Sequence, residues 1–238
     1  SYRRSIELNP QFHPAYFNLG ELKLHAGEIG VQLLKKCLLI EDGFINASLL
    51  LSERLIEEER FKECAEWLQR FPRTLVQSYE IQIRLISCLF EMKDHERCRQ
   101  RSQSLISLDP AREEAYLSSA LATEELGLSS RSPLHRALSI SPESISTKLI
   151  VARNDIDEGR FESAKHHIEG ILRQDPNNAA ALSLIPFTIK MKPEDACWVN
   201  AATLCASGGD VSDFDRVALL FSMGKYYDDI KSYDQAFQ

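Results

Sequence analysis

The chain has 238 residues, of which 44% are hydrophobic and 26% are charged, and its formal net charge is −7 at pH 7. This length and composition predict an ordered chain with a substantial hydrophobic core and exclude a disordered one. An acidic chain lacks the clustered Lys and Arg that bind a phosphate backbone, so we expect no nucleic-acid partner.

The sequence also argues against contact with a membrane. Its longest mostly apolar stretch, residues 179–189, is far shorter than the roughly 20 residues that a spanning helix needs. The first residues, Ser-Tyr-Arg-Arg, lack the apolar region of a signal peptide. We therefore predict a cytoplasmic protein.

A partial pattern at residues 1–10 ends in Pro10, and the same pattern is clearest farther along, at residues 145–176. There, apolar residues three and four apart predict one helix from Ile145 and a second from Phe161. The turn Glu158-Gly159-Arg160 lies between them, and Pro176 ends the second helix. This pattern predicts a helical hairpin.

The hairpin pattern recurs along the chain at a period close to 34 residues. Its closing residues are Pro10, Asp42, Pro110, Pro142 and Pro176, with spacings of 32, 68, 32 and 34, where 68 is two periods. Helical pairs at this period indicate a repeat architecture. We predict a single array over residues 1–238, divided into a partial repeat at 1–10, repeats at 11–44, 45–78, 79–112, 113–144 and 145–178, an atypical stretched repeat at 179–212 and a partial repeat at 213–238.

The stretched repeat and the two ends depart from the regular pattern. Pro186 falls within a helical pattern and predicts a kink or break at about Ile185. From Pro176 to the next first helix, expected near Asp213, no clean second helix is indicated. Both ends fall within predicted second helices without a polar capping face, so we expect a piece of a longer array that self-associates through its uncapped ends.

Several segments carry the residue pattern of a known family. They are Tyr16-x-x-Leu19-Gly20, Tyr116-x-x-x-Ala120, and Leu220-x-x-Met223-Gly224-x-x-Tyr227 followed by Tyr233 and Ala236. With these residues the chain resembles the tetratricopeptide repeat family. The resemblance implies an all-α fold, a right-handed α-solenoid of helix-turn-helix repeats, with Tyr227 as a core aromatic.

Small residues in this pattern lie where two helices cross closely. A larger side chain there overpacks the contact at a cost of roughly 1–3 kcal/mol. We therefore expect Gly224→Leu to lower the melting temperature. Cys37, Cys64 and Cys98 occupy such positions, and we predict that all six cysteines are reduced, buried small residues. The other three are Cys88, Cys197 and Cys205.

The resemblance also implies a concave groove lined by the first helix of each repeat. Seven of the twelve residues at two groove positions of the six better-defined repeats are acidic, which favours a protein or peptide partner rich in Lys or Arg. The alternative is that these are solvated positions in an acidic protein, where glutamate has good helix propensity. The candidate groove residues are Phe17, Glu21, Leu24, Glu53, Glu57, Glu91, Leu117, Glu125, Leu149, Arg153, Asp157, Phe221, Lys225 and Asp229.

No pattern in the sequence indicates catalysis, a cofactor or a metal. Nucleotide-binding, zinc-protease and serine-hydrolase motifs are absent, and no C-x-x-C pair occurs. The pair His166-His167 is interpreted as a surface feature, because adjacent helix residues point about 100° apart. Phe17 and Glu21 stand where a chaperone-tail clamp carries Lys and Asn, which argues against that subfamily.

A second resemblance concerns the C-terminal residues. The run from Arg216 to Gln238 is similar to the last repeat of bacterial tetratricopeptide proteins that continue into a sulfotransferase domain, although Ser222, Tyr226 and Lys231 depart from the common residues. Two function classes therefore remain. The chain is a non-catalytic scaffold that binds a protein or peptide, or it is the substrate-presenting arm of a larger transferase, a sulfotransferase first and a glycosyltransferase second.

Overall fold

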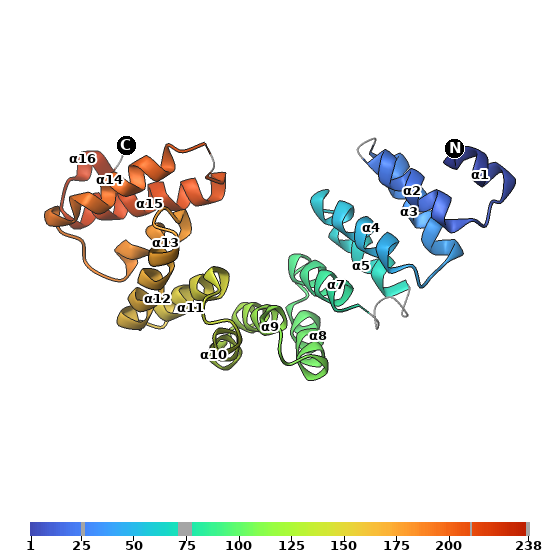
Figure 1. Ribbon diagram of the computed structural model, residues 1–238. Coiled ribbons are helices and arrows are strands. Elements are labelled where there is room, and N and C mark those ends of the chain that lie inside the picture. Colours follow the sequence, from blue (N-terminus) through green and yellow to red (C-terminus); the bar gives the residue numbers. More distant parts are fainter. Residues whose placement is uncertain (25–26, 71–77, 210, 237–238) are drawn as a thin grey trace. The chain divides into compact units, whose positions relative to one another are not determined.

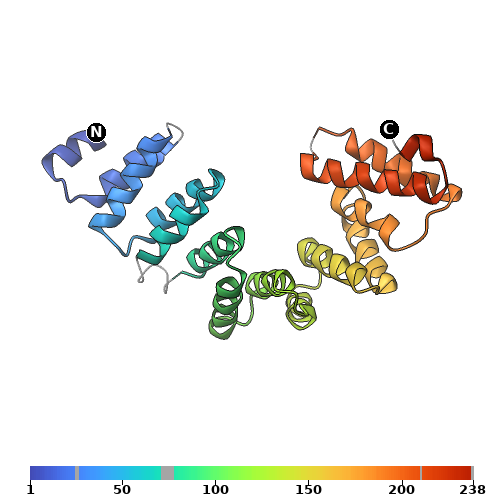
Figure 2. The same cartoon turned by 180° about the vertical axis from the view of Figure 1, so that it is seen from behind.

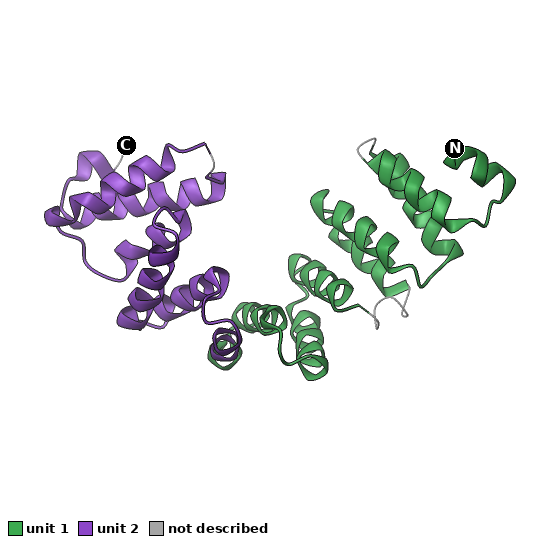
Figure 3. Cartoon of the chain, viewed as in Figure 1, with its two compact units in different colours: residues 1–133 green, residues 134–238 purple. Residues whose placement is uncertain are grey.

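The computed structural model describes residues 1–24, 27–70, 78–209 and 211–236 (Figure 1). Within these ranges the chain forms 15 α-helices and two short 3₁₀ helices, and no strand (Figure 2). It divides into two compact units, Ser1–Pro133 and Leu134–Gln238 (Figure 3). The predicted all-α fold is confirmed.

In the first unit the helices follow one another as antiparallel pairs joined by short turns. Helices α2 and α3 form one such pair, as do α4 and α5, and α7 and α8. The bounds are α1 Tyr2–Leu8, α2 His13–Lys23, α3 Glu28–Ile40, α4 Ile45–Glu57, α5 Phe61–Arg70, α7 Tyr79–Glu91, α8 His95–Leu108 and α9 Glu113–Glu125.

The division between the two units falls within helix α10. Helices α11 and α12 begin at Ile145 and Phe161, where the sequence pattern places them. The bounds are α10 Arg131–Ile140, α11 Ile145–Asp157, α12 Phe161–Gln174, α13 Ala179–Leu184, η2 Ile185–Phe187, η3 Pro193–Asp195, α14 Ala196–Ala206, α15 Asp213–Asp229 and α16 Tyr233–Ala236.

Five of the turns between helices share one backbone conformation. Each contains a residue with positive φ, followed by a residue whose N–H returns to a carbonyl of the last helical turn, as in Arg60 N to Leu55 O at 2.8 Å and Asp94 N to Leu89 O at 2.9 Å. This hydrogen bond belongs to the Schellman motif, which ends a helix sharply. The positive-φ residues of these turns are Glu59, Lys93, Gly127, Gly159 and Lys231, whereas Gly27, with φ 71° and ψ −135°, adopts a different conformation.

The stretched repeat bears out one prediction and corrects another. Helix α13 ends at Leu184 and a 3₁₀ turn begins at Ile185, so the break predicted from Pro186 is confirmed. The expectation of no clean second helix is wrong, because α14 forms at Ala196–Ala206. The Trp198 indole ties it back by donating to Leu182 O at 3.1 Å.

The apolar core differs between the two units. The first contains one large cluster that runs through all its helix pairs and includes Leu34, Leu55 and Leu89, each fully buried. The second contains two smaller clusters, one around Ile171 and one around Trp198, Leu219 and Tyr226. Each helix pair of the second unit therefore has less apolar support from its neighbours.

One aromatic residue of this core is misassigned by the sequence pattern. Tyr226, not Tyr227, is buried, at 3% exposure, and its ring lies 5.9 Å from that of Trp198. Tyr227 is half-buried at the edge of the same cluster. Tyr226 therefore takes the interior place predicted for Tyr227, because Tyr226 is the residue of α15 that meets Trp198 of α14, and Tyr227 packs only at the edge of the core.

The cysteines are free thiols, but not all are buried. Cys37, Cys64, Cys88 and Cys98 are buried as predicted. Cys197 is exposed and Cys205 is partly exposed, so the prediction is wrong for these two. Both lie on α14, the helix that the sequence pattern does not indicate.

At the left-handed turn residues, replacing a non-glycine residue by glycine and replacing glycine by alanine should change stability in opposite directions. A non-glycine residue in the left-handed conformation costs about 1–2 kcal/mol. Replacing it by glycine removes this cost, but the greater conformational freedom of glycine in the unfolded chain offsets about 0.5–1 kcal/mol of the gain. We expect Lys93→Gly to raise the free energy of unfolding by about 0.5 kcal/mol, and Gly127→Ala to lower it.

Urea unfolding of the full chain measures both changes. Lys165→Gly is the matched control, since Lys165 is an exposed residue inside α12, where glycine costs about 1 kcal/mol. A loss of stability in Lys93→Gly as large as that in the control would contradict the role of the turn.

Of the two glycines compared, Gly30 rather than Gly224 lies at a close contact with a neighbouring backbone. A Cβ on Gly30 would lie 2.6 Å from the Leu24 Cα and 2.7 Å from the Leu24 nitrogen, which are backbone atoms, whereas a Cβ on Gly224 would lie 3.6 Å from Ala236 O. We expect Gly30→Ala to cost about 1–3 kcal/mol through overpacking and Gly224→Ala to be close to neutral. Thermal melts of the two variants compare them directly, and equal melting temperatures would refute the assignment.

Candidate functional site

The predicted groove acids of the first unit lie on neighbouring first helices. Helix α4 contacts α7, and α7 contacts α9. Glu53 on α4, Glu91 on α7 and Glu125 on α9 are exposed, as are Glu57 on α4 and Glu21 on α2. The sequence pattern therefore places several carboxylates in solvent on helices that stack beside one another.

These carboxylates differ in their partners. Glu57 pairs with Arg54 on its own helix, with 3.3 Å between carboxylate oxygen and guanidinium nitrogen. Glu125 lies 3.9 Å from the His95 ring nitrogen, a contact that is ionic only when the histidine is protonated. Among the residues that the structure describes, no ion pair or side-chain hydrogen bond engages Glu21, Glu53 or Glu91. These three are available to an external cation.

The apolar candidates of the first unit are shared with its core. Phe17 and Leu24 pack against the buried cluster, and the Phe17 ring meets that of Phe44 edge-on at 5.1 Å. Leu117 is half-buried. Their exposed edges can contribute to a binding face, but most of their area stabilises the helix pairs.

The candidates of the second unit fall into different environments. Leu149 packs against the smaller core cluster, and Arg153 and Asp157 are exposed. Phe221 is 69% exposed and stacks on Phe187, with ring centroids 6.2 Å apart.

Lys225 and Asp229 are already engaged with each other. The Lys225 ammonium lies 2.7 Å from the Asp229 carboxylate, which also accepts the Met191 N–H at 3.1 Å. Burial acts to raise the pKa of Asp229, but the hydrogen bonds from Lys225 and Met191 outweigh it and hold the pKa below its usual value. This pair fastens the segment before α14 to α15.

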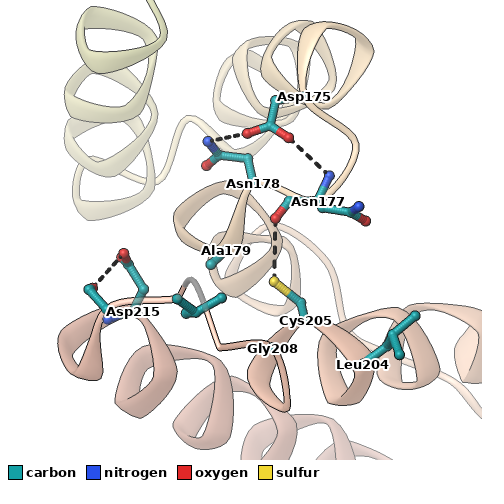
Figure 4. Close-up of a pocket in the computed structure, with 10 residues that line it drawn as sticks. Asp175, Asn177, Asn178, Ala179, Leu204, Cys205, Gly208 and Asp215 are labelled. Atoms are coloured by element: carbon teal, nitrogen blue, oxygen red, sulfur yellow. Dashed lines mark hydrogen bonds between the residues drawn. The ribbon is translucent and has the colours of Figure 1, made fainter.

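A hollow of about 510 Å³ at the start of α13 was not indicated by the sequence (Figure 4). The Cys205 thiol donates to Asn177 O at 3.3 Å, and burial raises the pKa of Cys205. Asp175 accepts from the Asn177 N–H at 3.3 Å and from the Asn178 amide at 3.0 Å, and Asp215 accepts from a serine hydroxyl. The polar groups of this hollow therefore form hydrogen bonds within local turns. The Cys205 thiol, with its raised pKa, is poorly suited to nucleophilic attack.

The pair His166-His167 is only half on the surface. His166 is exposed, but the side chain of His167 is 15% exposed and its ring lies 3.9 Å from the buried Asp155. Burial lowers the pKa of His167. The surface interpretation is wrong for His167, because the buried charge of Asp155 creates a polar environment within the helix pair.

In the part of the chain that the structure describes, metal-binding and membrane-spanning features are absent. No group of three or more His, Cys, Asp and Glu side chains there is arranged to hold a metal ion. No helix combines the length and the apolar character needed to cross a bilayer.

No protein-family model matches the sequence, and no curated protein matches it either. Solved structures do match. A tetratricopeptide repeat protein from Parabacteroides merdae is 12% identical with a TM-score of 0.72, over 94% of this chain and 89% of that chain. PilF from Pseudomonas aeruginosa is 18% identical with a TM-score of 0.61, over 95% and 97%.

A third similar structure is YrrB, described as a tetratricopeptide repeat protein with an unusual peptide-binding site. It is 15% identical with a TM-score of 0.59, over 76% of this chain and 96% of that chain. The chain has the fold of tetratricopeptide repeat proteins. The structural similarity thus establishes an α-solenoid of helix-turn-helix repeats. The sequence identities alone are too low to establish it.

The helix pairs bury some thiols and expose others. Chemical labelling can measure the difference as a modification rate for each cysteine. We expect iodoacetamide at neutral pH to modify Cys197 first and Cys205 more slowly. Burial raises the pKa of Cys37 and of Cys98 to about 11, so both should react only after unfolding. Peptide-mapped mass spectrometry over time gives each rate, and modification of Cys37 before Cys197 would contradict the burial described.

Proposed function

We propose that the chain is a non-catalytic scaffold that binds a protein or peptide segment carrying Lys or Arg along its first helices. The observation that carries the proposal is the set of exposed carboxylates without partners, Glu21, Glu53 and Glu91, on three first helices of the first unit. Carboxylates of one sign on one face favour a cationic partner and repel an anionic one.

The half-buried apolar residues add a second type of contact. Phe17 and Leu117 lie on first helices, Leu24 directly follows α2, and all three keep part of their surface in solvent. An extended or helical peptide can cover this area while its basic side chains meet the carboxylates. Peptide binding in YrrB is consistent with such a use of the fold. Self-association through the end helices and a cytoplasmic location stay predictions.

The competing interpretation is that the carboxylates only solvate an acidic protein. Fluorescence anisotropy with short labelled peptides, one set rich in Lys and Arg and one rich in Asp and Glu, separates the two cases. We expect the full chain to bind the basic set more tightly, with an affinity that falls as salt is added, since exposed charges are screened.

A charge-matched pair of variants locates the interaction. Exposed charges contribute about 0.2–1 kcal/mol each, so the triple variant Glu21→Gln, Glu53→Gln, Glu91→Gln should bind the basic peptides about fivefold more weakly. The control variant Glu66→Gln, Glu162→Gln, Glu169→Gln removes the same charge from exposed positions on second helices. Equal losses in both variants, or preference for the acidic peptides, would reject the proposal.

A second candidate function rests on the residue pattern from Arg216 to Ala236 in α15 and α16. It is that the array forms the non-catalytic arm of a larger transferase, with a sulfotransferase as the first choice. The coding sequence after Gln238 tests it. A strand, a glycine-rich turn and a helix would support this function, and a further helical repeat would contradict it.

A further inference from the structure

Helix α11 buries a lysine within its helix pair. The fourth residue of the first helix is large and buried in three other pairs, as Tyr16, Tyr116 and Leu182, and is Ser48 in α4 and Gln82 in α7. In α11 this residue is Lys148, which is only 8% exposed. Burying an ammonium group is costly unless it is paired and hydrogen-bonded. The groups around Lys148 therefore decide what its charge can do.

Lys148 faces a hollow of about 410 Å³ within the second unit. Its walls come from the end of α10, the segment that follows it, α11 and α12. Pockets of this size hold small organic ligands. Its lining includes Glu143, Lys148, His166, His167, Gly170 and Arg173.

Gly170 lets two cations converge over the floor of this hollow. A Cβ built on Gly170 would lie 3.6 Å from Arg173 Nη2 and 3.7 Å from Lys148 Nζ. The guanidinium and the ammonium group therefore approach the same point of α12 from two helices. Because residue 170 has no side chain, the space between them is open.

The negative charge at the hollow is limited to one carboxylate at its rim. Lys148 donates to Glu143 Oε2 at 2.9 Å, and Gln174 donates to the same oxygen at 2.9 Å. The Glu143 side chain is 83% exposed. Within the described part of the chain, no ion pair or hydrogen bond engages the Arg173 guanidinium. One solvated carboxylate thus faces the Lys148 ammonium and the exposed Arg173 guanidinium.

The buried carboxylate of Asp155 does not neutralise them. It accepts from Arg160 Nη2 at 2.6 Å and from Arg160 Nε at 2.9 Å, and it lies behind the His167 ring. His167 and His166 complete the wall with ring nitrogens that can donate hydrogen bonds. The hollow is therefore a cationic site in a protein of net negative charge.

We propose that this hollow binds the phosphate group of a small phosphate monoester. Lys148 would act as a point charge, Arg173 as a two-pronged donor to phosphate oxygens, and the open space over Gly170 as the seat of the anion. The volume exceeds what a bare ion fills, so the remainder would accept the organic part of the ligand. This site is independent of the carboxylate face of the first unit.

Titration of the isotope-labelled full chain, followed by amide NMR spectra, tests the site. The probes are inorganic phosphate, phosphoserine and glucose 6-phosphate, with acetate at matched ionic strength as the control anion. We expect saturable shifts of the amides of residues 143–148 and 166–174, with tighter binding of the monoesters than of inorganic phosphate. Tighter binding of inorganic phosphate would overturn the organic part of the proposal, and equal shifts with acetate would overturn the whole of it.

Variants separate a defined site from general attraction to positive charge. Arg173→Gln and Lys148→Met should each weaken monoester binding about tenfold, since each removes a charge-assisted contact. Lys148→Met should keep or raise the melting temperature, because its partner Glu143 is solvated. Gly170→Ala should weaken binding without unfolding, because its Cβ meets both cations only at ordinary contact distance.

Lys165→Gln is the matched control, since it removes an exposed charge of α12 that does not line the hollow. It should bind the monoesters as the unaltered chain does. Unchanged affinity in Arg173→Gln, or an equal loss in Lys165→Gln, would refute the site.

Discussion

The structure depends on one backbone constraint, the left-handed residue that follows a helix in five of its turns. It allows the next N–H to return to a carbonyl of the preceding turn, as from Arg60 to Leu55 and from Arg160 to Asp155. The second helix can then begin two to four residues later and run back along the first. Because three of the five positions hold glutamate or lysine rather than glycine, the conformation must be maintained by the packing of the pair it creates.

Once the helices pair, the composition of their contact decides what each repeat can do. In the first unit the contact is filled mainly by Leu55, Leu89 and similar residues, and buried polar groups such as Ser52 and Ser102 donate to backbone carbonyls of their own helices. In α11 the buried face carries Lys148 and Asp155, seven residues apart and so on one side of the helix. These buried charges reduce the apolar area that stabilises the pair. Lys148 also gives the hollow a cation that a purely apolar contact would not supply.

The sequence predicts those features that depend on local patterns. The starts of α11, α12 and α15 follow from apolar periodicity, and the break at Ile185 follows from the geometry of proline. The burial of Tyr226 and the exposure of Cys197 were missed because they depend on α14, whose apolar spacing does not follow the repeat. The hollow over Gly170 was missed for another reason. It brings together residues of three segments, and periodicity within one helix cannot indicate their convergence.

The two proposed sites differ in how their charges meet solvent, and this difference sets how each would recognise a ligand. Glu21, Glu53 and Glu91 are exposed, so water and salt screen them, and they can attract a basic segment without fixing its position. Lys148 is buried and held by Glu143, so solvent screens its charge less and its position is fixed. An exposed row suits a partner recognised by overall charge, whereas a fixed, recessed ammonium beside the exposed Arg173 guanidinium suits one chemical group.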